Sequence, residues 1–141
     1  MAAPPFYTRM RSFDTNLDRY FIYEFLLPAT LLMHSGGYPT GTTDQDGPQT
    51  VHLHSCQTLT PETEHSTHYF FQQALPGPQR DQSLVDSIYG SLEQAFNEDR
   101  DMITAQHRNL GRVGARPMLP LAMDAALLQF RRVLESRLAL E

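Results

Sequence analysis

The stretch Val51-His-Leu-His-Ser-Cys-Gln-Thr-Leu59 alternates in side-chain character with a period of two, which is typical of a half-buried β-strand. Its first face carries Val51, Leu53, Ser55, Gln57 and Leu59. Its second face, expected to be the wetter one, carries His52, His54, Cys56 and Thr58. Turn residues follow at Thr60-Pro-Glu-Thr63, and another strand-like run follows at Ser66-Thr-His-Tyr-Phe-Phe-Gln72. The sequence therefore predicts an antiparallel hairpin over these two runs.

Two more strands are predicted on the N-terminal side of this hairpin. Residues 19–27 form an aromatic and β-branched run, which Pro28 breaks. Ala29-Thr-Leu-Leu-Met-His34 is typical of a further strand. We expect that strand to end before Gly36-Gly37 and a polar loop that reaches about Pro48.

The period changes on the C-terminal side. After Pro76-Gly-Pro78, apolar residues recur from Asp81 onward at spacings of three and four, which predicts a helix that stops near Gly111. Its inward face would carry Val85, Ile88, Tyr89, Leu92, Phe96, Asp99, Ile103 and Gln106. A last helix is predicted over residues 124–138, with a buried stripe of Met123, Ala126, Leu127, Phe130, Val133, Leu134 and Leu138. Strands followed by helices indicate one α+β domain in which an antiparallel sheet packs on helices.

Composition excludes several classes of protein. The 141 residues carry a net charge of −5, and the eleven basic residues are all Arg and do not cluster, which argues against a nucleic-acid partner. The single cysteine, Cys56, excludes an internal disulfide framework and a cysteine-ligated iron–sulfur cluster held by this chain alone. The most apolar stretch, residues 20–33, is too short for a membrane helix, and the N-terminus does not resemble a secretory signal. We therefore expect a cytoplasmic protein with no membrane partner.

Asp99 is the most informative single position, because it lies on the apolar stripe of the first long helix. A buried carboxylate is costly unless an Arg, hydrogen-bond donors or a metal accompany it. An internal salt bridge, or a helix rotated so that Asp99 lies at the edge of the stripe, is the commoner explanation of such a pattern. His52 and His54 share a strand face and could present two imidazoles to one metal, although solvent-facing histidines are the commoner case. A self-contained site of His52, His54 and Asp99 is a weaker hypothesis, since Asp99 should meet the opposite strand face.

Several motifs occur together in one order along the chain. They are Thr58-Leu-Thr-Pro-Glu-Thr63, Ser66-Thr-His-Tyr-Phe-Phe71, Phe96-Asn-Glu-Asp99, Ala105-Gln-His-Arg-Asn109, Arg116-Pro-Met-Leu-Pro120 and Asp124-Ala-Ala-Leu-Leu-Gln-Phe-Arg-Arg132. From about residue 12 to the end, this combination resembles the C-terminal end of vanillate O-demethylase oxygenases, which are Rieske non-haem iron oxygenases.

The resemblance implies a helix-grip (START-like) catalytic domain, in which a curved antiparallel sheet wraps over a long helix. In that family two histidines and one carboxylate hold a mononuclear Fe(II) and leave positions open for O₂. The carboxylate belongs to a helical Glu-Asp motif that falls on Asp99 here, so the resemblance implies a metal-ligand role for this residue. This chain has Gln57 where relatives often carry His. Because Gln57 shares a strand face with Val51, Leu53 and Leu59, we expect it to be a polar group that lines the substrate pocket.

Two parts of the family pattern are absent from residues 1–141: the Rieske motifs, and the segment that supplies both histidine ligands. The chain is therefore expected to be an incomplete, C-terminal portion of a catalytic domain, inactive by itself. Its partners would be an N-terminal chain or segment that bears the 2Fe–2S Rieske cluster, a reductase, and further copies in a homo-oligomer, expected to be a trimer. The complete enzyme would use O₂ to demethylate or hydroxylate an aromatic acid in aromatic compound catabolism. The alternative is a noncatalytic helix-grip module that binds a small apolar ligand or a partner protein.

Overall fold

The computed structural model describes residues 1–42, 47–75, 81–114 and 119–140. The elements along the chain are α1 (Pro5–Thr8), β1 (Leu17–Leu26), β2 (Thr30–Pro39), β3 (Val51–Pro61), β4 (Thr67–Ala74), α2 (Gln82–Val113), the 3₁₀ helix η1 (Ala122–Asp124) and α3 (Ala125–Leu138). They fall into two compact units, residues 1–91 and residues 92–141, whose boundary lies within α2. The α+β class is confirmed. The expected strand end at residues 76–78 and motif residues 116–118 lie outside the described residues.

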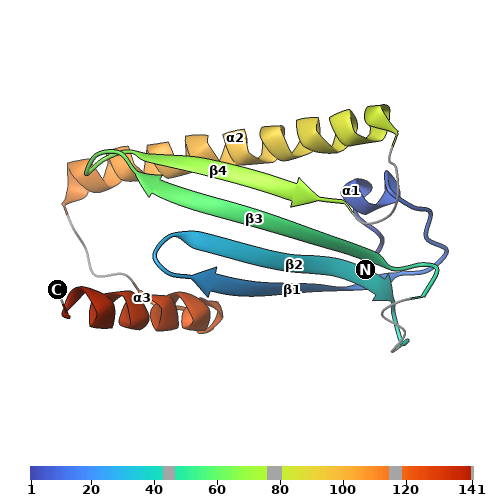
Figure 1. The fold of residues 1–141 in the computed structure, drawn as a ribbon, viewed down its shortest axis with the longest axis horizontal. Coiled ribbons are helices and arrows are strands. Elements are labelled where there is room, and N and C mark those ends of the chain that lie inside the picture. The colour runs from blue at the N-terminus through green and yellow to red at the C-terminus, as the bar shows by residue number, and fades with distance from the viewer. Residues whose placement is uncertain (43–46, 76–80, 115–118, 141) are drawn as a thin grey trace. The chain divides into compact units, whose positions relative to one another are not determined.

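The sheet is an antiparallel meander with the strand order β1-β2-β3-β4 (Figure 1). All four predicted strands are present, and β3 and β4 form the predicted hairpin. We call the side that bears Leu17, Val51 and Leu53 the core face, and the side that bears His52 and His54 the outer face.

Strand β2 is longer than the sequence predicts, because it continues through Gly36 and Gly37 to Pro39. The prediction treated the two glycines as the start of a loop, and packing explains why they belong to the strand. A Cβ atom on Gly36 would lie 2.1 Å from the Val51 carbonyl oxygen and 2.7 Å from the Tyr20 hydroxyl. Glycine here makes room for a neighbouring strand and a tyrosine ring, a known use of glycine within sheets.

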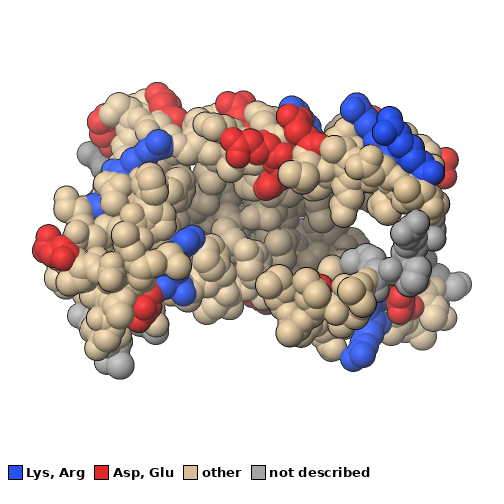
Figure 2. Space-filling view, turned by 180° about the vertical axis from the view of Figure 1, so that it is seen from behind, with Lys and Arg blue, Asp and Glu red and all other residues tan. Residues whose placement is uncertain are grey.

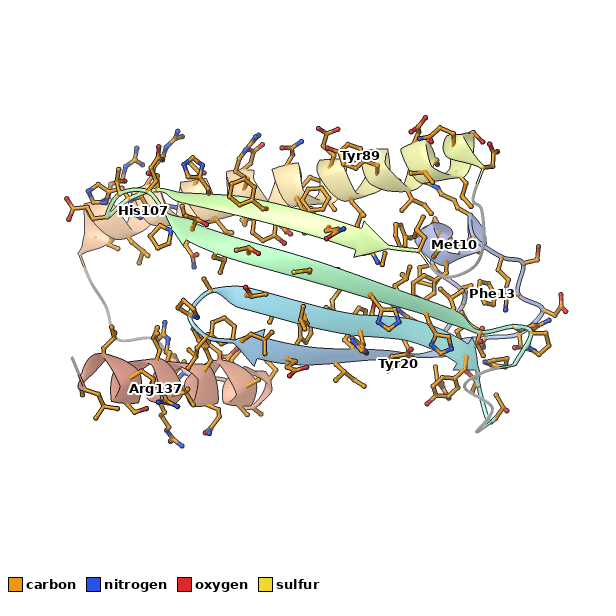
Figure 3. The ribbon with its side chains drawn as sticks, in the orientation of Figure 1. Met10, Phe13, Tyr20, Tyr89, His107 and Arg137 are labelled. Atoms are coloured by element: carbon orange, nitrogen blue, oxygen red, sulfur yellow. The ribbon has the colours of Figure 1, made fainter. Side chains whose placement is uncertain are left out.

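The buried core lies at one end of the core face. Its fully enclosed cluster consists of Tyr7, Leu17, Val51 and Leu53, with Ala3, Phe6, Met10, Phe13 and Leu75 packed around it. Figure 3 shows Met10 and Phe13 beside the end of the sheet where β1 and β3 begin. The short helix α1 delivers Tyr7 to this cluster, and the side chain of Tyr7 is only 3% exposed.

The start of α2 packs within the first unit. Ile88 is buried, and the Tyr89 ring stacks on Phe71 of β4 with ring centroids 6.0 Å apart. A guanidinium nitrogen of Arg9 donates to the Ser87 carbonyl oxygen at 3.3 Å and to the Ser91 hydroxyl. These contacts hold the first ten residues of α2 against the core face.

The predicted end of α2 and its predicted buried face are both partly wrong. The helix passes through Gly111 and ends at Val113, and the next residue, Gly114, has a φ of +75°, the left-handed conformation that glycine adopts after a helix. Along the expected inward face, burial declines from Ile88 to half-buried Phe96, and Ile103 is 64% exposed. Helical periodicity identifies the apolar face of a helix but does not say how far along the helix that face is covered.

Helix α3 lies where it was predicted, but its expected buried stripe is not buried. Phe130 and Leu134 are half-buried, and Met123 is 84% exposed. On the same stripe, Leu127 is 39% exposed and Leu138 is 61% exposed. No helix in the described part of the chain is long and apolar enough to cross a membrane.

Candidate functional site

Gln57 lies in the middle of β3 on the core face, as the alternation predicted. The strand register places it between Leu31 of β2 and Phe71 of β4, with Phe25 of β1 next in the same row. Its amide nitrogen donates a hydrogen bond to the Ser55 hydroxyl oxygen at 3.3 Å. Both side chains are half-buried, so the amide is held in place and still accessible.

A further polar side chain borders Gln57 and Ser55. Gln73 of β4 lies directly opposite Ser55 in the register. Its amide nitrogen donates to the backbone carbonyls of His54 at 2.9 Å and Ala74 at 3.2 Å, which fixes the amide against the strand. The alternation of β3 alone could have suggested Ser55, whereas Gln73 required the register of the hairpin.

Aromatic and aliphatic side chains surround these polar groups. On the core face, Phe21, Tyr23 and Tyr69 are 48%, 57% and 39% exposed, so this part of the sheet is uncovered within the first unit. Figure 2 shows that uncharged side chains make up most of the surface in that view, with Arg and acidic side chains in small separate groups. The arrangement can hold an aromatic ring by apolar contact and bind a polar substituent by hydrogen bonds.

Arg19 is the one charged side chain among the described strand residues of the core face. Its guanidinium carbon lies 5.4 Å from the centroid of the Tyr7 ring and 4.9 Å from that of Phe21. These cation–π contacts tie Arg19 to the core end of the sheet.

Asp99 lies on α2 in the second unit and is exposed, so the expectation that it faces a packed interior is not met among the described residues. The structure records no hydrogen bond or ion pair between its carboxylate and another described residue. By contrast, the carboxylate of neighbouring Asp101 forms an ion pair with the Arg100 guanidinium, with an N–O distance of 3.0 Å. The proposed metal-ligand role of Asp99 stays a prediction.

A tyrosine–histidine contact on the outer face escaped the sequence analysis. Tyr20, Gly36 and His52 lie in one row across three strands, and the Tyr20 hydroxyl is 2.6 Å from His52 Nδ1. Figure 3 shows Tyr20 on β1. His52 is consequently half-buried and its Nε2 is enclosed, so this end of the outer face is drier than predicted. Gly36, which lies opposite Tyr20 on β2, was the sequence feature that could have indicated this contact.

The remaining histidines do not form a metal centre. His34 and His54 pack edge to face with ring centroids 4.3 Å apart. No group of three His, Cys, Asp or Glu side chains that could hold a metal occurs within the described ranges. A self-contained site of His52, His54 and Asp99 therefore has no support, and Cys56 is a half-buried free thiol.

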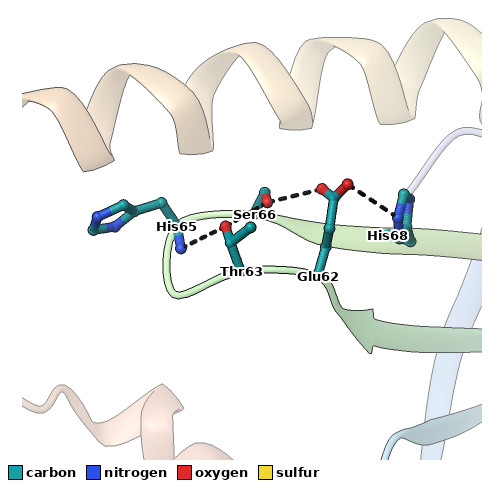
Figure 4. Close-up of polar contacts among 5 residues, drawn as sticks. All are labelled: Glu62, Thr63, His65, Ser66 and His68. Atoms are coloured by element: carbon teal, nitrogen blue, oxygen red, sulfur yellow. Dashed lines mark hydrogen bonds and ion pairs between the residues drawn. The ribbon is translucent and has the colours of Figure 1, made fainter.

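His65 lies in the turn between β3 and β4, and His68 lies near the start of β4 (Figure 4). The Glu62 carboxylate accepts a hydrogen bond from the Ser66 hydroxyl at 2.8 Å and lies 3.6 Å from His68. The backbone N–H of His65 donates to the Thr63 hydroxyl at 3.1 Å. The network is exposed and stabilises the turn, and it does not bring the two imidazoles together as ligands.

These observations test whether a mononuclear iron fits this chain alone. The family's set of two histidines and a carboxylate needs three side chains that converge, and the described residues contain no such group. The described part of the chain therefore offers at most a partial set of ligands.

Comparison with known proteins gives the family context. The family model described as "Vanillate O-demethylase oxygenase C-terminal domain" matches residues 1–140. Over 132 residues the chain is 42% identical to the putative toluene-4-sulfonate monooxygenase system iron-sulfur subunit TsaM2 and 41% identical to the corresponding subunit TsaM1, both of Comamonas testosteroni. Over 130 residues it is 32% identical to a vanillate O-demethylase oxygenase subunit of a Pseudomonas species.

Coverage differs between this chain and its relatives. The alignments cover 92% of this chain for the two Comamonas subunits and 91% for the Pseudomonas subunit, but only 38% and 40% of those proteins. No solved structure shows significant similarity to the chain. The chain belongs to the family of vanillate O-demethylase oxygenase C-terminal domains.

Proposed function

We propose that residues 1–141 form the C-terminal part of the catalytic domain of a Rieske non-haem iron oxygenase that acts on an aromatic acid. The observation that carries the proposal is the match of the family model to residues 1–140. The names of the relatives support it, because they are oxygenase or iron–sulfur subunits of systems for vanillate and toluene-4-sulfonate. The reaction would be an O₂-dependent demethylation or hydroxylation.

In the complete enzyme, this chain would supply the substrate-facing sheet and one metal ligand. Gln57, between Leu31 and Phe71, would line the pocket and orient the ring. Asp99 would donate its carboxylate to an Fe(II) whose two histidine ligands come from another segment or chain. The bound iron would supply the activation of O₂. The strand residues would bind and orient the aromatic ring.

Further partners follow from the same proposal. The 2Fe–2S Rieske cluster would be carried by a segment or chain that aligns with the part of the relatives that residues 1–141 do not cover. A reductase would deliver the electrons, and the complete enzyme would form a homo-oligomer, with a trimer as the expected state, in the cytoplasm. The alternative of a noncatalytic binding module is not favoured, because the relatives' names describe oxygenases.

The test is to complete the enzyme. Residues 1–141 would be joined to the uncovered N-terminal part of the Comamonas testosteroni relative, loaded with iron and sulfide, and assayed with a reductase. We expect O₂ uptake and product formation that depend on an aromatic carboxylate or sulfonate. The same N-terminal part without this chain is the control and should be inactive. A joined protein with a full complement of iron and cluster but no turnover would contradict the proposal.

A further inference from the structure

Strand β1 has one edge that no other described strand covers. It is the first strand in the order β1-β2-β3-β4, and it pairs with β2 along all ten of its residues (Figure 1). An unpaired edge is a template for a further strand, and proteins commonly protect it with a bulge, a proline or a very short strand. The register of β1 with β2 is continuous, and β1 contains no proline. This free edge therefore keeps the geometry that an added strand needs.

The hydrogen bonds at the start of β1 show which of its backbone groups face the free edge. The Thr40 N–H donates to the Asn16 carbonyl oxygen at 2.9 Å, and the next pair along the register is Leu17 with Pro39. Bonded and non-bonded pairs alternate along an antiparallel ladder, so Leu17 makes no backbone bond to β2. From Leu17 onward, the N–H and C=O groups of every second residue point away from β2. These residues include Arg19, Phe21 and Tyr23.

Met1 already makes the first pairing on the free edge. The Leu17 N–H donates to the Met1 carbonyl oxygen at 2.7 Å, and the Met1 amino group donates to the Leu17 carbonyl oxygen at 3.1 Å. Two residues that exchange both bonds form a hydrogen-bonded pair of an antiparallel ladder. Further along this edge, no backbone partner is recorded for Arg19, Phe21 or Tyr23 among the described residues.

The pair of Met1 and Leu17 fixes the direction and the register of a chain that enters residue 1. In an antiparallel ladder, each step backward from Met1 moves one residue forward along β1. The fourth and sixth residues before Met1 would then lie opposite Phe21 and Tyr23 on the core face. Both of these side chains are exposed, so apolar residues at the two positions would cover them. The fifth residue before Met1 would lie opposite Ile22 on the outer face.

The comparisons indicate which segment would occupy the edge. The matched family is a C-terminal domain, and the alignments cover only 38% and 40% of the relatives. A complete oxygenase of this family therefore has a long N-terminal part that leads into the equivalent of residue 1. Because that segment is covalently joined to residue 1, it would meet the edge at a high effective concentration. A second copy of the chain would have to bind from solution.

We propose that the segment leading into residue 1 of the complete oxygenase adds to the free edge of β1 as a fifth, antiparallel strand, in the register set by Met1 and Leu17. The identity of this segment rests on the proposed function, whereas its direction and register rest on the hydrogen bonds at Leu17. Its side chains alternate between the two faces and are apolar where they lie opposite Phe21 and Tyr23. The N-terminal part and this chain thus share one sheet.

Amide hydrogen exchange tests the pairing and needs neither iron nor turnover. Mass spectrometry with residue resolution would compare the 141-residue chain with the joined oxygenase, in which the N-terminal part of the relative runs directly into Met1. The edge amides of Arg19, Phe21 and Tyr23 should exchange about tenfold or more slowly in the joined protein, because a hydrogen-bonded amide exchanges only after local opening. The amide of Ile22, which bonds to β2, is the internal control and should be protected equally in both proteins.

A disulfide in the joined protein tests the register. Ile22→Cys would be combined with a cysteine substituted at the fifth position before Met1. The two residues would form a non-hydrogen-bonded pair with Cα atoms about 4.5 Å apart, which is within the range of a disulfide. Ile22→Cys with a cysteine substituted at the fourth position is the matched control, because that side chain would lie on the opposite face. After mild oxidation, peptide mapping should find the first cross-link and not the second.

Three results would overturn the inference. The first is equal exchange of the three edge amides in the chain alone and in the joined protein, with thermal melting showing that both are folded. The second is protection of these amides in a dimer of the 141-residue chain, which would make a second copy the occupant. The third is a cross-link in the control and none in the predicted register. Protected edge amides without turnover would refute the proposed function alone, and turnover with unprotected edge amides would refute this inference alone.

Discussion

Replacing Gly36 by alanine tests the close packing of strands β1 to β3 that positions both faces of the sheet. The added Cβ would lie 2.1 Å from the Val51 carbonyl oxygen, a backbone atom, and 2.7 Å from the Tyr20 hydroxyl. Overpacking of this kind costs about 1–3 kcal/mol, and the upper end applies because backbone must move. Loss of the contact between Tyr20 and His52 would cost about 1 kcal/mol more. Alanine also lowers the conformational entropy of the unfolded chain, which stabilises the folded state by a similar amount and offsets this loss.

The net expectation for Gly36→Ala is a loss of about 3 kcal/mol, or roughly 12 °C in melting temperature for a domain of this size. Thermal unfolding followed by circular dichroism measures it. Gly90→Ala is the matched control: nothing lies within 4 Å of an added Cβ there, and alanine favours the helix, so that variant should be more stable by about 0.5–1 kcal/mol. Equal melting temperatures for Gly36→Ala and the unaltered chain would refute the reasoning.

Two further predictions concern single hydrogen bonds. Tyr20→Phe removes the 2.6 Å contact with half-buried His52 and should cost about 1–2 kcal/mol in denaturant unfolding, whereas Tyr23→Phe, at a side chain 57% exposed, should change little. At the start of α2, hydrogen bonds from the Ser83 hydroxyl and then its backbone N–H lower the pKa of Asp81 from its usual 3.8. The carboxylate therefore stabilises the fold above pH 3.8 and loses that effect as the pH falls through its lowered pKa. Melting temperatures should thus show Asp81→Asn as less stable at neutral pH, with the difference shrinking in acid, and a constant difference would contradict this.

Local periodicity was sufficient to predict the four strands and the two long helices, although it did not give the correct ends of β2 and α2. The alternation at residues 51–59 places Gln57 on the face of Val51 and Leu53, and the structure has the same arrangement. The side-chain periods of strands and helices depend only on backbone geometry, so a short stretch of sequence is enough to reveal them. The hairpin followed from the same pattern and from the turn residues between its strands.

Features that depend on contacts between distant residues could not be predicted in this way. In the sequence Gly36 resembles a turn residue, and only the structure shows that the Tyr20 side chain occupies the space beside it. The contact between Tyr20 and His52 could be predicted only with the register of three strands. Likewise, periodicity marks Phe130 as apolar but does not identify what covers it. Gln73 joins the candidate site only through its pairing with Ser55.

Iron analysis of the joined oxygenase tests the central claim most directly, because it asks whether this chain completes the metal site through Asp99. Asp99→Asn should retain the Rieske cluster but lose the mononuclear iron, since a neutral amide is a poorer ligand for a hard divalent cation than a carboxylate. Asp101→Asn is the control: Asp101 pairs with Arg100 and lies about 200° around the helix from Asp99, so its variant should keep the mononuclear iron. Equal mononuclear iron in the two variants would contradict the account.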